Sequence, residues 1–344
     1  MTRFLRVLEA GPGCQVQDAG REGYYRFGVP EGGVMDRAAL YENAALLSQP
    51  VACAVLEMAG LGGRFEVLGG PLRLALTGAP MRAKIDGVAL EWNATAWLEP
   101  GQVLEIGAAE TGVYGYLGVG GGFAVAASLG SRATLVRAGI GGFFGRALAG
   151  GDPLPLGPDD AADTQLRLEA QERFGGGNIR VLWGPQSGMF SSSERDRFAN
   201  IEYCVDHRAN RMGVRLQTDE PPLRAEGHLS NVSDAVSLGD VQIPGDGYPA
   251  VLLADRQTTG GYPRIATIIQ ADLARMVQAR PGESICFKPV SLDEALAALA
   301  GQQQRWQGLA GQVTQRLRDP FTMHDLLDYE LASGAIAGEQ LPWE

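Results

Sequence analysis

Residues 72–80 read Leu-Arg-Leu-Ala-Leu-Thr-Gly-Ala-Pro, a short apolar run that ends in a glycine and a proline. Similar runs stand at 113–117 (VYGYL) and 251–254 (VLLA), and glycine supplies 48 of the 344 residues. That share is about twice the ~7% that is usual in proteins. Short strands separated by turn residues are typical of a β barrel or sandwich. The sequence therefore predicts a mainly β fold with a few helices.

Helical signals are confined to a few segments. Asp36 is placed to cap a helix over residues 37–48, in which leucine and alanine recur on one face. A serine and a glutamate at capping-box spacing open a second helix at 191–194, and another such pair opens a helix over 291–318. A further helix, ended by a glycine, is expected over 323–333.

The composition changes near the middle of the chain. Residues 152–178 hold prolines, four aspartates and three consecutive glycines, which is typical of a linker. On either side of it, Pro-Gly turns at 100–101 and 281–282 and Thr-Gly segments at 77–80 and 259–263 recur 181 and 182 residues apart. This spacing indicates two duplicated β domains, with chance recurrence of common turns as the alternative. The expected division is a first β domain over 1–151, a linker over 152–178, a second β domain over 179–290 and a helical tail over 291–344.

Charge and composition exclude several classes of protein. Asp and Glu outnumber Lys and Arg by 40 to 29, and the resulting net charge of −11 repels phosphate backbones, which argues against nucleic-acid binding. No apolar run approaches the ~20 residues of a membrane helix, and residues 1–6 lack the apolar stretch of a secretory signal. We therefore expect a cytoplasmic protein that does not act at a membrane.

The cysteines and histidines are too scattered to predict a disulfide framework or a metal site. Four cysteines and three histidines are present, and Cys204 and His207 form the only close pair. The two lysines, Lys84 and Lys288, lie neither behind a Gly-rich phosphate loop nor in the Met-Lys context of a biotin carrier. The serine of residues 184–188 (GPQSG) stands one place too late for a nucleophile elbow. We expect no metal and no covalently bound cofactor, and these residues do not identify a catalytic group.

A polar segment among glycines, over residues 16–24, is a first candidate binding loop. It carries Gln17, Asp18 and Arg21 and is followed by Asp36. The amide and the guanidinium can hold a carboxylate or an amide, the guanidinium through two parallel hydrogen bonds. A structural turn pair between Asp18 and Arg21 is the alternative.

A second candidate loop, over residues 129–143, carries Arg132 and Arg137 beside glycines. Two arginines together with backbone amides can clamp an anion. Arginines at solvated strand edges are the alternative.

The strongest candidate is a loop between two apolar runs, over residues 254–263 (ADRQTTGGYP). Its polar side chains exceed what a turn requires, since a two-residue hairpin needs only Asn-Gly or a similar pair. Its glycines let the backbone approach a ligand closely, and its arginine supplies a fixed positive fork. The alternative is an ion pair between the adjacent aspartate and arginine that only stabilises the fold. The candidate residues of this loop are Asp255, Arg256, Gln257, Thr258, Thr259, Gly260 and Tyr262.

Ordered motifs along the chain resemble one known family. They are the segments 16–24 (VQDAGREGY), 28–36 (GVPEGGVMD), 56–57 (LE), 116–122 (YLGVGGG), 130–142 (GSRATLVRAGIGG), 184–186 (GPQ), 211–216 (RMGVRL) and 255–267 (DRQTTGGYPRIAT). Through them the chain is similar to the allophanate-hydrolase-subunit-2-like carboxyltransferase family. That family includes the C subunit of bacterial 5-oxoprolinase, the antagonist of the Kip kinase inhibitor and the carboxyltransferase part of urea amidolyase. The resemblance implies two cyclophilin-like β-barrel domains and says nothing of the helical tail.

The 255–267 segment resembles the stand-alone bacterial 5-oxoprolinase members, which implies that the chain is the C subunit of such an enzyme. Together with an A-subunit-like chain and a B-subunit-like (Kip-inhibitor-like) chain, it would use ATP with magnesium to open 5-oxoproline to L-glutamate. The isolated chain is expected to be inactive. The candidates to hold the carboxylate or a phosphorylated species are Arg21, Arg137, Arg211 and Arg256.

Two other activities of the same family stay open. One is that of a carboxyltransferase subunit in a biotin-dependent carboxylase of the urea or allophanate type, served by a separate carrier chain. The other is that of a non-catalytic antagonist of a kinase inhibitor.

Overall fold

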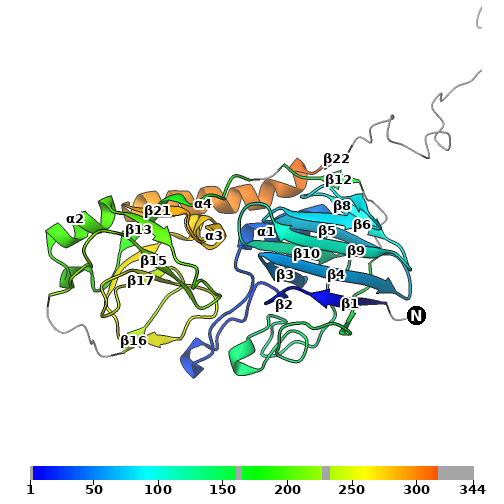
Figure 1. Cartoon of the computed structure of the whole chain (residues 1–344), viewed down its shortest axis with the longest axis horizontal. Coiled ribbons are helices and arrows are strands. Elements are labelled where there is room, and N and C mark those ends of the chain that lie inside the picture. Colours follow the sequence, from blue (N-terminus) through cyan, green and yellow to red (C-terminus); the bar gives the residue numbers. More distant parts are fainter. Residues whose placement is uncertain (1–2, 160–164, 170, 227–232, 317–344) are drawn as a thin grey trace, which may run out of the picture.

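A computed structural model describes residues 3–159, 165–169, 171–226 and 233–316, and it has the mainly β fold that the sequence predicts (Figure 1). The strands of the first half of the chain lie in two sheets, and those of the second half close into a barrel. Helix α4 (Leu292–Gly308) lies along both halves (Figure 1). No helix in the described ranges is long and apolar enough to cross a membrane.

The first half packs two antiparallel sheets around a common core. One sheet has the strand order β11-β1-β4-β9-β6-β7, and the other has the order β2-β3-β10-β5-β8. In β6 (Met81–Ile85) buried and exposed residues alternate, as they do in a strand with one face in a core. Apolar side chains of both sheets meet in one buried cluster. The other strands are β1 (Phe4–Ala10), β2 (Gln15–Gln17), β3 (Val55–Ala59), β4 (Leu61–Leu68), β5 (Leu72–Gly78), β7 (Val88–Ala89), β8 (Thr95–Leu98), β9 (Val103–Ala109), β10 (Tyr114–Val119) and β11 (Pro153–Pro155).

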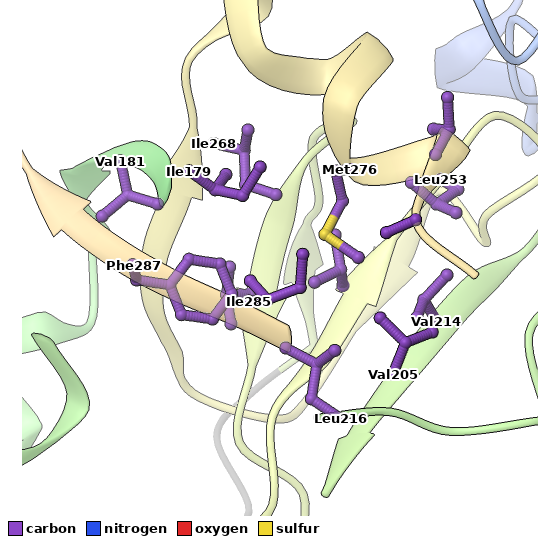
Figure 2. Packing of buried hydrophobic residues seen from close by; sticks show 14 of the residues in the cluster. Ile179, Val181, Val205, Val214, Leu216, Leu253, Ile268, Met276, Ile285 and Phe287 are labelled. Carbon is purple, nitrogen blue, oxygen red and sulfur yellow. The ribbon is translucent and has the colours of Figure 1, made fainter. Parts of the chain in front are cut away.

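The second half closes into a barrel with the strand order β13-β20-β17-β18-β15-β14-β21. Closure occurs where β21 pairs in parallel with β13, which places Ile179 opposite Phe287. Figure 2 shows apolar side chains filling the interior, among them Ile179, Phe287 and Met276, the last from α3 (Leu273–Gln278). The strands are β13 (Gly177–Trp183), β14 (Glu202–Val205), β15 (Gly213–Gln217), β17 (Asp240–Gln242), β18 (Ala250–Leu252), β20 (Arg264–Ile268) and β21 (Ser284–Pro289).

The edge of the first half at β2 is completed by a loop. The amide of Thr134 donates to the Val16 carbonyl (3.0 Å), and Gln17 Nε2 donates to the Thr134 carbonyl (3.0 Å). The loop therefore forms hydrogen bonds with the polar groups at this edge of the sheet. In a closed barrel, a further strand would form these hydrogen bonds instead. The two halves thus share a β architecture, but only the second is closed by strand pairing in the described part of the chain.

The three helices predicted from capping signals are confirmed. Asp36 caps α1 (Arg37–Leu47), and Ser191 caps α2 (Ser192–Asn200). The capping box of Ser291–Glu294 is formed in both directions and opens α4. The capping signals in the sequence therefore predict correctly where these helices begin.

The C-terminal helix is shorter than the predicted range of 291–318. It ends at Gly308 and is followed by the 3₁₀ turn η5 (Leu309–Gln312) and the short strand β22 (Thr314–Gln315). The helix predicted over 323–333 lies outside the described residues.

Segments predicted as a linker and a tail pack together on the first half. β11 joins the six-stranded sheet beside β1, and β12 (Leu166–Arg167) pairs with β22. Leucines of α1, of the β12 segment and of η5 form a separate buried cluster. The division of the chain at residues 151, 178 and 290 stays a prediction.

The recurring Pro-Gly turns have the same local structure. Gly101 and Gly282 adopt φ values of 92° and 90°, and each turn leads into a strand, β9 or β21. The strands themselves pair differently, because β9 is antiparallel to both its neighbours whereas β21 is parallel to β13. The two Pro-Gly segments thus share a turn conformation, and the duplication of the two domains stays a prediction.

Candidate functional site

Arg211 ties the two halves of the chain together. Its guanidinium binds Asp255 through two hydrogen bonds (2.8 and 2.9 Å) and also donates to Glu57 and to the Gly33 carbonyl (2.8 Å). Glu57 comes from β3, and it accepts further hydrogen bonds from Tyr116 and a backbone amide. Burial acts to lower the pKa of Arg211, but the two carboxylates outweigh it and hold that pKa above its ordinary value. Each nitrogen of the Arg211 guanidinium thus has a partner within the protein, and the network joins the two halves of the chain.

Arg21, in contrast, is buried with most of its hydrogen-bonding capacity unused. Its side chain is 2% exposed, and its Nη2 donates to the Ala133 carbonyl. Its Nε and Nη1 have no hydrogen-bond partner among the described residues. Burial lowers the pKa of Arg21, while the nearby carboxylates of Asp18 and Asp255 act in the opposite direction.

Arg256 is likewise buried with hydrogen-bond donors that have no partner among the described residues. Its side chain is 4% exposed, and its Nε and Nη1 are also without a partner in the described part of the chain. The guanidinium carbon lies 5.5 Å from the centre of the Tyr25 ring, which offers a cation–π contact. A buried unsatisfied donor costs about 1–3 kcal/mol, and guanidinium groups of this kind are suited to accept an anion as partner.

Both arginines line one pocket of about 410 Å³ between the two halves of the chain. The first half contributes the loops before α1, and the second half contributes residues 237–238 and part of α3. α4 adds Gln302 and Trp306. The volume is within the range of small-molecule sites, roughly 300–1,000 Å³. The other charged residues of the lining are Arg37, Glu22 and Glu31.

Two glycines leave the space that the Arg21 guanidinium occupies. A Cβ at Gly32, whose φ is +63°, would lie 3.1 Å from Arg21 Nη1. A Cβ at Gly141, whose φ is +70°, would lie 3.0 Å from Arg21 Nη2 and 1.9 Å from the Ala133 carbonyl oxygen. Gly141 therefore needs glycine for space and for backbone conformation, whereas at Gly32 the positive φ favours glycine and a Cβ would push the Arg21 guanidinium aside slightly.

The first two predicted loops lie side by side. Asp18 accepts hydrogen bonds from Ser131 Oγ (2.6 Å) and from the amides of Arg132 (2.5 Å) and Gly20 (2.9 Å), rather than forming an ion pair with Arg21. The alternative of an Asp18–Arg21 turn pair is therefore wrong. Asp18 instead fixes the loop from which Arg21 enters the pocket.

The third predicted loop sends Arg256 into the pocket and uses its other residues elsewhere. Asp255 pairs with Arg211, so the alternative of an Asp255–Arg256 ion pair is wrong. The Thr258 carbonyl accepts a hydrogen bond from Tyr25 (2.7 Å). The remaining candidates lie outside the pocket lining: Gln257 is half-buried, Thr259 and Gly260 form β19 (Thr259–Gly260) against β16 (Asp234–Ala235), and Tyr262 is exposed.

Four other candidates also lie outside the lining of this pocket. Asp36 caps α1 and is bound by Arg173 (2.6 Å), and Arg132 Nε donates to a backbone carbonyl (2.9 Å). Gln17 is buried at the β2 edge, as described above. Arg137 is exposed and lines a separate, mostly apolar depression with His207. Asp36, Arg132 and Gln17 thus have partners within the protein, although Gln17 Oε1 has none among the described residues.

Glu57, Gln302 and Trp306 are among the residues of the pocket and its neighbouring network that were not predicted as candidates from the sequence. Glu57 had a usable signal, because a carboxylate inside the apolar run 55–59 (VLEMA) must find a buried partner. Gln302 and Trp306 had none, since they stand in the polar stretch 301–308 (GQQQRWQG), where successive glutamines do not show which face of the helix is buried. No cluster of three or more His, Cys, Asp or Glu side chains able to hold a metal occurs within the described ranges.

Comparisons with known proteins agree with the resemblance seen in the motifs. The family "Carboxyltransferase domain, subdomain A and B" matches residues 27–289. The C subunit of 5-oxoprolinase from Escherichia coli is 37% identical over 312 residues, which is 89% of this chain and 98% of that protein. The C subunit of 5-oxoprolinase from Haemophilus influenzae is 34% identical over 292 residues, covering 85% of this chain and 93% of that protein.

A solved structure of the K. lactis urea amidolyase shares the fold. Its TM-score is 0.81 at 24% sequence identity, over 92% of this chain and 21% of that one. The match to this larger protein bears on the architecture alone.

Proposed function

The chain belongs to the family of the carboxyltransferase domain with subdomains A and B, and from this premise we propose that it is the C subunit of a 5-oxoprolinase. In this proposal the chain helps to open 5-oxoproline to L-glutamate as part of a cytoplasmic hydrolase complex. An A-subunit-like chain and a B-subunit-like chain complete the complex, and ATP with magnesium drives the reaction. Both relatives named above are subunits by name, which supports a role beside partner chains.

The observation that carries the proposal is the pair of unpartnered guanidinium groups of Arg21 and Arg256 in one pocket. 5-oxoproline carries one carboxylate, and a guanidinium fork matches a carboxylate through two parallel hydrogen bonds. A substrate bound this way would satisfy donors that the protein leaves buried and unpaired. Since these groups are desolvated in advance, little reorganisation is needed when the anion enters.

The chemistry of the reaction fits a division of labour among the subunits. The lactam of 5-oxoproline is unstrained, so its carbonyl must be activated before water can add and the C–N bond can break. We assign the activation to phosphoryl transfer from ATP, with ATP bound by a partner chain. The phosphorylated species carries more negative charge than the substrate, and the two arginines would stabilise it further.

Reconstitution tests the proposal. The purified chain, the chain with a B-subunit-like partner and the complete three-chain mixture are each given 5-oxoproline, ATP and magnesium, and glutamate release is measured. We expect release only from the complete mixture. Arg21→Met should abolish most of it, whereas the control Arg82→Met, at an exposed arginine on β6, should not. No release from the wild-type mixture would refute the proposal, and release from the isolated chain would refute the division of labour.

A second candidate function is transfer of a carboxyl group in a biotin-dependent carboxylase of the urea type. The description of the matching family as a carboxyltransferase domain favours it. It would require a separate biotin carrier chain. ATP-dependent carboxylation of urea by a mixture of this chain, a biotin carboxylase and a carrier would support this function, and its absence beside active 5-oxoproline cleavage would exclude it.

A further inference from the structure

Helix α4 contributes two residues, Gln302 and Trp306, to the pocket that holds the arginines. They stand four residues apart and so lie on one face of the helix. α4 begins at Leu292, beyond the residues 27–289 that match the family. Its part in the site is therefore read from this structure and not from the resemblance.

Gln302 is buried with an unused acceptor. Its side chain is 6% exposed, and its Nε2 donates to the Ala271 carbonyl of η4 (Gln270–Asp272) at 3.4 Å. Its Oε1 has no hydrogen-bond partner within the described ranges. One helical turn on, the Trp306 ring stacks on Tyr41 of α1 with centroids 4.2 Å apart and an interplanar angle of 15°. These contacts on either side fix the position of α4 at the pocket.

Three residues of the pocket lining thus carry buried hydrogen-bonding atoms without a partner in the described part of the chain, and these atoms are of two kinds. Arg21 and Arg256 can only donate, and they suit an anion. The free Oε1 of Gln302 can only accept, and it suits an N–H group. A small ligand that carries an anionic group and an N–H donor satisfies all three residues at once, whereas a simple carboxylate leaves Gln302 unsatisfied.

We propose that Gln302 accepts the lactam N–H of 5-oxoproline while Arg21 and Arg256 hold its carboxylate, so that α4 selects a lactam over a ring without an N–H. This inference rests on the proposed function and assigns a specificity-determining residue within it. Gln302 acts before ring opening, because the N–H that it accepts is present in the closed ring. When the C–N bond breaks, this nitrogen becomes the amine of glutamate. The role needs no proton transfer to Gln302.

The test compares 5-oxoproline with its lactone analogue, 5-oxotetrahydrofuran-2-carboxylate, in which oxygen replaces the N–H. The complete three-chain enzyme is prepared with wild-type chain, with Gln302→Leu and with the control Gln304→Leu, which changes an exposed glutamine of the same helix. The KM for 5-oxoproline and the inhibition constant of the lactone are measured for each. We expect the wild type and the control to prefer the lactam and Gln302→Leu to lose that preference by about tenfold, with the lactone constant nearly unchanged.

Each outcome bears on a distinct claim. If the wild-type complex cleaves 5-oxoproline but Gln302→Leu keeps the wild-type preference, the assignment of Gln302 fails and the proposed function stands. If Gln302→Leu weakens both compounds equally, its role is structural and the assignment also fails. A wild type that binds lactam and lactone equally overturns the assignment without any variant. No cleavage by the wild-type complex overturns the proposed function itself, and this inference with it.

Discussion

Replacing Arg256 with methionine should weaken the candidate site without weakening the fold. Two of the nitrogen groups of Arg256 are buried with no partner in the described part of the chain, and each such donor costs about 1–3 kcal/mol. Removing the guanidinium relieves this cost, so the free energy of unfolding should stay constant or rise. Loss of one charge-assisted contact to an anionic substrate, about 1.5–3 kcal/mol, should lower kcat/KM of the assembled enzyme by about 10- to 150-fold.

Arg211→Met is the matched control, because it removes the same group from a fully partnered arginine. The Arg211 guanidinium holds Asp255, Glu57 and the Gly33 carbonyl. Removing it leaves two buried carboxylates without their counter-ion, and breaking a buried pair in this way costs about 3–5 kcal/mol. The control should therefore lower the free energy of unfolding, which Arg256→Met should not do.

Both quantities are measured on the same preparations. Urea unfolding of the chain, followed by tryptophan fluorescence, gives the midpoint and the free energy of unfolding. ATP-dependent glutamate release by the complete mixture gives kcat/KM per folded chain. The reasoning is refuted if Arg256→Met lowers the urea midpoint as the control does while kcat/KM stays normal, because Arg256 would then serve the fold and not a ligand.

Three further results are expected. Gly32→Ala should raise the KM for 5-oxoproline and lower the thermal midpoint, since its Cβ would crowd Arg21 Nη1 at 3.1 Å; an unchanged KM would contradict this. Asp206→Asn should make the thermal midpoint fall less steeply in acid, as a series of thermal midpoints at different pH values would show. Hydrogen bonds from a neighbouring arginine hold the pKa of Asp206 well below its usual range. The stability that its carboxylate contributes is therefore present above about pH 4 and is lost as the pH falls toward the pKa of the folded state. A thiol reagent at about pH 8 should label the exposed Cys204 quickly and Cys14 only after unfolding, because burial raises the pKa of Cys14 to about 12; equal rates would contradict it.

Signals that act over a few residues predicted the elements well. Asp36, Ser191 and Ser291 cap the helices that they were expected to cap, because an N-cap bond spans only three residues. The short apolar runs bounded by glycines form strands, as predicted, because their pattern is also a local one. The closure of the second half by a parallel pair between β13 and β21 joins segments more than a hundred residues apart, and no local pattern determines such a pairing.

The site was predicted in part. Arg21 and Arg256 were both candidates, since arginines in polar, glycine-rich loops suit anion binding, and the structure brings them to one pocket. The sequence did not predict that these arginines form no ion pairs with the aspartates near them in the chain. Those aspartates have other partners, since Asp255 binds Arg211, 44 positions away in the chain. Gln302 differs from its neighbour Gln304 only in the face of α4 on which it lies, and packing alone decides that.

Near the end of its described part the chain comes back to α1, where Leu309 of η5 shares a buried cluster with Leu46 and Leu47, and β22 pairs with β12. A ribosome synthesises the chain from the N-terminus, so Leu46 and Leu47 cannot reach their final apolar partner until Leu309 has left the exit tunnel. We therefore expect a nascent chain that has completed both β halves still to expose part of this apolar surface of α1. Contacts this far apart in sequence also slow folding, since the loop between them must close first. Docking of η5 on α1 is thus the step that we expect to cover this patch.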